Sequence, residues 1–151
     1  MRVFIFALIC LLCASGKAQL LEVDPVDMGT VALADNNSVQ TLSIDVFGNV
    51  VNSGGFRVII DGQPGLYRAT NLLPNVLYNV TVSVQNATMN PNQASLEFFV
   101  FDIPSYDQQV LTDVNGEADI RVGGRITTSG SGGRIFAEAP HVSAIQITIG
   151  F

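Results

Sequence analysis

Alternation of apolar and polar residues is the feature that most constrains this chain. In the segment LYNVTVSVQ, Tyr78, Val80, Val82 and Val84 occupy every second position, with polar residues between them. Successive side chains of a β-strand point to opposite faces, so a period of two predicts a half-buried strand. No window shows a helical stripe with caps, and the chain is therefore expected to be all-β. The same alternation recurs at 42–47, 56–61, 96–103, 118–122 and 145–151.

Turn-forming residues separate these segments at short intervals. Gly, Asn, Ser and Pro gather at 53–55, 62–65, 90–92 and 129–133. Short strands with such punctuation predict an antiparallel β-sandwich or barrel. No internal repeat or interdomain linker is visible, so residues 19–151 are expected to form a single β-sandwich domain.

One of the segments is apolar at nearly every position. In SLEFFVFDIP, residues 95–104, Leu96, Phe98 and Val100 occupy one face, and Phe99, Phe101 and Ile103 occupy the other. A strand with two apolar faces is normally buried on both sides of its sheet. We therefore expect this segment to be covered on both faces.

The first 18 residues have the features of a secretory signal peptide. Arg2 provides a positive charge, and the apolar run 3–13 is shorter than the roughly 18–20 residues that span a bilayer. Small residues precede Gln19, and cleavage after Ala18 is expected; an N-terminal membrane anchor is the alternative. Cys10 and Cys13, the only cysteines, would leave with the signal, so the secreted protein would have no disulfide.

The charge of the chain limits its partners. Removing Arg2 and Lys17 with the signal leaves five basic residues against 13 acidic ones, a net charge of −8. Such acidity argues against binding to nucleic acid or to an anionic membrane. No later segment reaches the roughly 18 apolar residues of a membrane-spanning helix, so no membrane span is expected in the mature chain.

The sequence offers no catalytic constellation. His141 is the only histidine, no cysteine remains after signal cleavage, and no G-x-S-x-G motif is present. The acidic residues are scattered, without a pair that would suggest glycoside hydrolysis. We expect neither an enzyme nor a cofactor, and His141 is interpreted as a polar loop residue before the last strand.

One acidic segment has two interpretations. In DVNGEAD, Asp113, Asn115, Glu117 and Asp119 place oxygen atoms at alternate positions, as a weak calcium site would. Gly116, however, disturbs the spacing of a calcium-binding loop. Asn-Gly is also a strong hairpin signal, and alternating acidic residues are ordinary on the wet face of a strand. A hairpin is the favoured interpretation, and the calcium site is the alternative.

The final segment, HVSAIQITIGF, ends in an alternating apolar row. Ile145, Ile147, Ile149 and Phe151 occupy every second position. Such a row predicts a strand with one face turned to the core. It is also suited to pairing with a strand of another protein, because alternate side chains then fill pockets while the backbone supplies hydrogen bonds.

Several stretches together resemble one protein family. VDMGTVAL near the start, VGGRITTS after a hairpin, and an alternating last strand that ends on an aromatic residue resemble the bacterial domain of unknown function 4402. Gly123 and Gly124 are the best match, whereas Met28 stands where the family usually has Phe before Gly29. The resemblance covers residues 21–151 and implies an immunoglobulin-like, pilin-type sandwich, similar to spore-coat-U and chaperone–usher subunits.

The resemblance also implies a mode of assembly. In pilin-type subunits a periplasmic chaperone pairs along the last strand. The sandwich also lacks one strand, and its groove stays open until the N-terminal segment of a neighbouring subunit fills it. Ile145, Ile147, Ile149 and Phe151 would then form the inward row of the last strand. Leu21 and Val23 would belong to a donor segment ahead of the first strand, but Pro25 cuts that segment short. The arm is short, or the subunit accepts a strand and donates none, or the domain is closed.

These observations give two functional hypotheses. The first is a secreted structural protein of the bacterial surface, a subunit of a pilus or fimbria-like fibre assembled by strand complementation. The second is a stand-alone extracellular binding module, adhesin-like, for carbohydrate or protein, with calcium as a potential stabiliser. Both place the protein outside the cytoplasm, exported through the periplasm.

Overall fold

The computed structural model describes residues 18–85, 88–89, 98–132 and 140–151. In these ranges every regular element is a β-strand and every strand pair is antiparallel, which confirms the predicted all-β, sandwich-like fold. No helix long and apolar enough to cross a membrane occurs in the described parts of the chain. The predicted signal peptide, apart from Ala18, and Leu96 lie outside the described residues.

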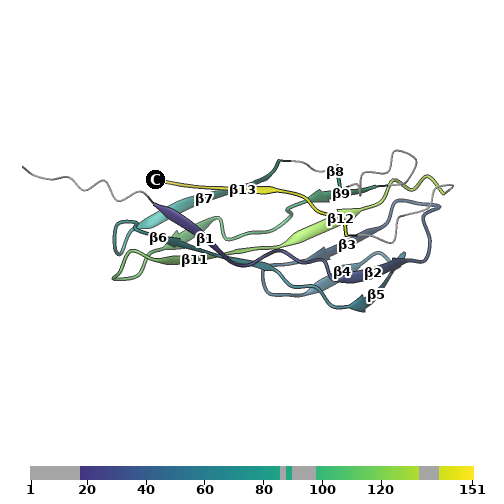
Figure 1. Ribbon diagram of the computed structural model, residues 1–151, viewed down its shortest axis with the longest axis horizontal. Coiled ribbons are helices and arrows are strands. Elements are labelled where there is room, and N and C mark those ends of the chain that lie inside the picture. The colour runs from purple at the N-terminus through teal and green to yellow at the C-terminus, as the bar shows by residue number, and fades with distance from the viewer. Residues whose placement is uncertain (1–17, 86–87, 90–97, 133–139) are drawn as a thin grey trace, which may run out of the picture.

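The thirteen strands run mainly along the long axis of an elongated molecule (Figure 1). In chain order they are β1 (Gln19–Asp24), β2 (Thr30–Leu33), β3 (Thr41–Ile44), β4 (Val50–Asn52), β5 (Phe56–Ile60), β6 (Gly65–Thr70), β7 (Leu77–Val84), β8 (Thr88–Met89), β9 (Phe99–Asp102), β10 (Gln109–Leu111), β11 (Ala118–Val122), β12 (Gly124–Thr127) and β13 (Ile145–Gly150).

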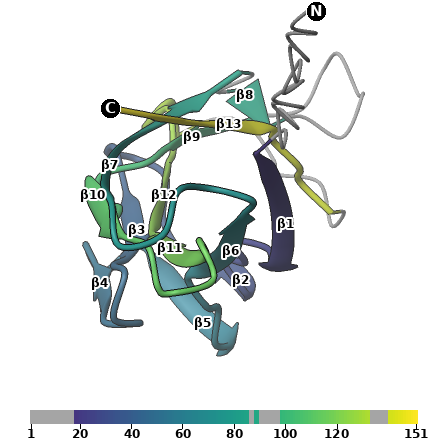
Figure 2. The same ribbon diagram turned by 90° about the vertical axis from the view of Figure 1, so that its left-hand side faces the viewer.

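Two three-stranded sheets form one end of the molecule. One has the order β1-β6-β11, and the other has the order β10-β7-β13. Seen from this end, β13 lies at the top, β7 and β10 at the left, β11 and β6 below, and β1 at the right (Figure 2). The strands therefore surround a core on three sides and part of the fourth.

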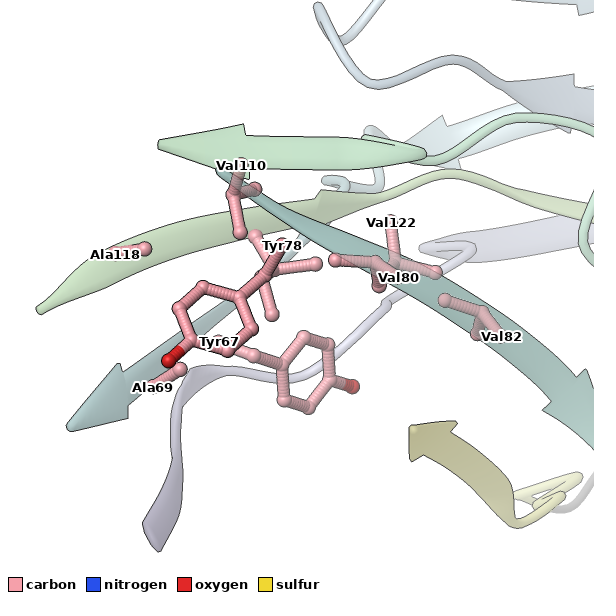
Figure 3. Close-up of a cluster of buried hydrophobic side chains, with 9 residues drawn as sticks. Tyr67, Ala69, Tyr78, Val80, Val82, Val110, Ala118 and Val122 are labelled. Atoms are coloured by element: carbon pink, nitrogen blue, oxygen red, sulfur yellow. The ribbon is translucent and has the colours of Figure 1, made fainter. Parts of the chain in front are cut away.

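The core of this end follows from the alternation seen in the sequence. Tyr78, Val80 and Val82 of β7 are buried, while Asn79, Thr81 and Ser83 between them are exposed, as the period of two predicts. The buried side chains converge with those of β6, β10 and β11 (Figure 3). Burying each valine contributes on the order of 1.5–3 kcal/mol of transfer free energy, so these strands hold together without a disulfide.

The other end contains a five-stranded sheet and a two-stranded sheet. Their orders are β4-β3-β12-β9-β8 and β2-β5. A second core cluster lies between them, made of Leu42, Phe56, Phe99, Phe101 and Ile126. Phe56 and Phe99 contact each other with ring centroids 6.0 Å apart, so the two sheets meet through aromatic side chains.

The strands of the described residues outnumber the seven to nine of an immunoglobulin-like domain, and one stretch of chain is divided between two sheets. β11 and β12 are separated only by Gly123; β11 pairs with β6, and β12 pairs with β3 and β9. A Cβ atom on Gly123 would lie 2.5 Å from the carbonyl oxygen of Ile44, and one on Gly124 would lie 2.9 Å from the Phe101 ring. Glycine is therefore required where the strand crosses between sheets.

The prediction that residues 96–103 are covered on both faces is wrong for the part that can be seen. Phe99 and Phe101 are buried, but Val100 is 39% exposed. The strand does have neighbours on both edges, β12 and β8. Apolar residues on both faces indicated full burial, yet only one face of β9 packs on the second core cluster.

A candidate strand-accepting groove

One long side of the sandwich is closed by backbone hydrogen bonds. The Gly123 amide donates to the Ser105 carbonyl oxygen at 2.8 Å, and the Asp107 amide donates to the Arg121 carbonyl oxygen at 3.0 Å. Tyr106 and Val122 form a β-bridge between these two bonds. The segment before β10 is thus joined to β11 across the two sheets; we name this contact, residues 105–107 against 121–123, the seam.

The opposite side of the sandwich is bordered by β1 and β13, and it is not joined in this way. β1 is paired only with β6, and β13 only with β7. Among the described residues no backbone hydrogen bond connects β1 to β13. Each of these strands therefore has one edge whose amides and carbonyls have no strand partner in the described part of the chain.

An apolar groove of about 1000 Å³ lies along this open side. Its floor is formed by Phe99, Phe101 and Ile126 of the second core cluster. Its volume lies at the upper end of the roughly 300–1,000 Å³ that pockets for compact ligands occupy. Since it follows the edges of two strands, its shape suits an extended segment.

Apolar side chains line both walls of the groove. Val26, Met28 and Val31 contribute from the side of β1 and β2, and Ile145 and Ile147 contribute from β13. Ile145 packs on both core clusters, so it lies where the two ends of the molecule meet. A partner strand that placed apolar side chains at alternate positions would contact both walls and the floor.

The predicted inward row of the last strand is found in part. Ile145, Ile147 and Ile149 are partly buried and pack on the first core cluster, and the first two line the groove. Phe151 departs from the row because it is 82% exposed. Its ring instead lies over the edge of the core, with its centroid 4.8 Å from that of Tyr78.

The predicted donor residues, Leu21 and Val23, lie in β1 rather than in a free arm. β1 pairs with β6 from the Gln19↔Thr70 pair to the Asp24↔Leu66 pair. Leu21 is 61% exposed and Val23 is 43% exposed, and neither lines the groove. Leu20 and Glu22, which alternate with Leu21 and Val23 along the strand, line the groove instead. Sequence reasoning did not identify them.

The groove has a polar part where β1 meets β6. Glu22 lies opposite Tyr67 in the strand register, and both line the groove. Burial raises the pKa of the Tyr67 hydroxyl, and the negative charge and hydrogen bond of Glu22 raise it further, so Tyr67 stays protonated and can donate to the carboxylate. His141 lies at the other wall and packs edge-on against Phe99, with ring centroids 4.9 Å apart.

The acidic segment 113–119 contains the tight turn that joins β10 to β11. One carboxylate oxygen of Asp113 accepts hydrogen bonds from the backbone amides of Asn115 and Glu117, both at 2.8 Å. These bonds, led by that of Glu117, hold the pKa of Asp113 below its ordinary value of 3.8. Asp119 is engaged by Arg68, at 2.7 Å on the neighbouring strand. The geometry therefore favours the turn over calcium binding.

No group of three or more His, Cys, Asp or Glu side chains is placed to hold a metal ion in the described ranges.

Comparison with known proteins identifies no relative: no protein-family model, no curated protein and no solved structure matches this chain.

Proposed function

We propose that this protein is a secreted structural subunit of the bacterial surface, pilus- or fimbria-like, which accepts an extended segment of another protein into the groove between β1 and β13. The observation that carries the proposal is that an apolar groove lies beside the edges of β1 and β13 that have no strand partner among the described residues.

The physical basis is β-strand addition. An added strand gains backbone hydrogen bonds along the edge of β13, β1 or both, and its alternate side chains enter the groove. Each apolar side chain that becomes buried there contributes on the order of 1.5–3 kcal/mol of transfer free energy. Ile145 and Ile147 are only partly buried in the free protein, so they have area left to bury against a partner.

Two of the stretches on which the resemblance to the bacterial domain of unknown function 4402 rests lie close together in the fold. Met28 of VDMGTVAL and Gly124 of VGGRITTS are nearly a hundred positions apart in the sequence, yet a Cβ atom on Gly124 would lie 3.0 Å from the Met28 sulfur. Both motifs therefore meet beside the groove.

The location and partners follow from the same proposal. The signal-like residues 1–18 support export, and a periplasmic chaperone or another pilin-like subunit would supply the strand. Because β1 is already paired with β6, no free arm occurs among the described residues, and this supports the role of strand acceptor over that of strand donor.

Substitution of one inward residue of β13 tests the proposal. The purified protein should bind a synthetic alternating apolar peptide, with a rise in melting temperature. Ile147→Asp should abolish binding, because it places a charge on the groove wall. Thr148→Asp is the matched control, since Thr148 is the adjacent, exposed residue of the same strand and does not line the groove.

Binding that survives in Ile147→Asp, or no binding by a sharply melting monomer, would contradict the proposal. The second result would favour the other hypothesis, a stand-alone extracellular binding module for carbohydrate or protein.

A further inference from the structure

The carboxylates among the described lining residues give this part of the groove a negative charge. Among the described residues that line it, Glu22 and Asp27 are the only carboxylates, and neither Lys nor Arg occurs. An extended segment that enters the groove must therefore place its polar positions near two negative charges. Opposite charge would favour such contact, and like charge would oppose it.

The two carboxylates are held in place by the fold. Asp27 forms a backbone hydrogen-bonded pair with Gln63, with N–O distances of 3.0 and 2.7 Å, and its side-chain oxygen accepts from the Gly29 amide at 2.8 Å. Glu22 is positioned by the pairing of β1 with β6. The Gly29 amide thus holds the Asp27 carboxylate in place, and the hydrogen bond with the Tyr67 hydroxyl holds that of Glu22.

A second copy of this chain is a poor match for such a groove. Its N-terminal segment, QLLEVD, would bring Glu22 and Asp24 against the Glu22 and Asp27 of the acceptor. The whole chain carries a formal net charge of −6, so approach of two copies is also opposed over longer distances.

We infer that the segment that fills the groove comes from a different protein and combines alternating apolar residues with Lys or Arg at intervening positions. The inference rests on the proposed function and adds the chemistry of the partner. It makes the protein an acceptor for a basic strand rather than the repeating unit of a self-complementing fibre.

Two synthetic peptides test this selectivity. Each has about eleven residues, which span ~36 Å as a strand, with valine at alternate positions and threonine between. In one peptide some of the threonines are replaced by lysine, and in the other the same threonines are replaced by glutamate. The lysine peptide should bind about fivefold to tenfold more tightly at low salt, as two partly exposed ion pairs allow. The preference should shrink as salt screens the charges.

A double variant tests whether Glu22 and Asp27 cause the preference for the lysine peptide. Glu22→Gln with Asp27→Asn removes both charges but keeps side-chain oxygens that can still accept the bonds of Tyr67 and the Gly29 amide. It should bind the two peptides with nearly equal affinity. Asp61→Asn with Asp35→Asn is the matched control, because both residues are exposed and lie outside the groove, and it should keep the preference.

The possible results distinguish failure of the inferred partner chemistry from failure of the proposed function. Equal binding of both peptides, or tighter binding of the glutamate peptide, would overturn the inferred partner chemistry and leave the groove as a strand acceptor. If neither peptide binds, the proposed function fails and the inference fails with it. A lysine preference that persists in Glu22→Gln, Asp27→Asn would place the selectivity elsewhere and overturn the inference.

Discussion

On one side of the sandwich, the seam joins β11 to the segment before β10 through backbone hydrogen bonds, whereas on the other side β1 and β13 border a groove. The two sides also differ in burial. Ile120 of β11 is fully buried, while all six residues of β1 are exposed. A strand edge without a partner beside an apolar surface is unfavourable in water. Among the described residues this combination occurs on the open side, which is the side proposed to accept a strand.

The largest expected difference between the two sides comes from the same substitution at two positions. Ile120→Ala removes a side chain that is 0% exposed and should lower the free energy of unfolding by about 4 kcal/mol. Ile147→Ala on the groove wall, which is only partly buried, should lower it by about 1 kcal/mol. Urea unfolding measures both values, and equal losses would mean that the β13 side is as closed as the seam.

A glycine substitution tests the seam itself. Gly123→Ala would bring a Cβ atom to 2.5 Å from the Ile44 carbonyl oxygen, a backbone atom that cannot easily move. We expect a loss of about 2–3 kcal/mol in the free energy of unfolding, as for overpacked interiors. Gly150→Ala in β13 is the control; its Cβ would have no neighbour within 4 Å, and the change should stay under about 0.5 kcal/mol. A Gly123→Ala variant as stable as Gly150→Ala would contradict the close packing at the crossing.

The smallest expected effect is on the pKa of Asp113, in the turn that joins β10 to β11. The hydrogen bonds to Asp113 lower its pKa in the folded state, so the stabilisation is present above its ordinary value of 3.8 and is lost as pH falls through the lower folded value. An NMR titration of the Asp113 carboxyl group should give a midpoint below 3.8. A midpoint at or above that value would mean that the turn is not formed as described.

The sequence predicted the elements with a clear period better than it predicted their arrangement. β7 and β13 alternate strictly, and the buried row of β7 and the partly buried row of β13 are the ones expected from residues 77–84 and 145–149. Alternation alone does not say which strands pair, because pairing depends on residues far apart in the chain. The groove, bordered by the first and last described strands, therefore could not be derived from local patterns.

The register of β1 is a specific case of this limit. Leu20, Leu21 and Val23 are all apolar, and the sequence favours the row of Leu21 and Val23. In the structure, pairing with β6 directs Leu20 and Glu22 to the groove, and the register shifts between Glu22 and Asp24. A one-residue change of register exchanges the two faces of a strand. The pairing with β6 therefore determines which row of β1 faces the groove, and periodicity alone could not predict it.

The most direct test of the open side is hydrogen exchange of the β13 amides, measured by NMR on the purified monomer. Amides bonded to β7 should exchange slowly, and the alternate amides that face away from β7 should exchange quickly. Addition of a bound alternating peptide should protect this second set. If the outward amides of β13 are already protected in the isolated monomer, the groove is closed by the chain itself and the account of a strand acceptor is contradicted.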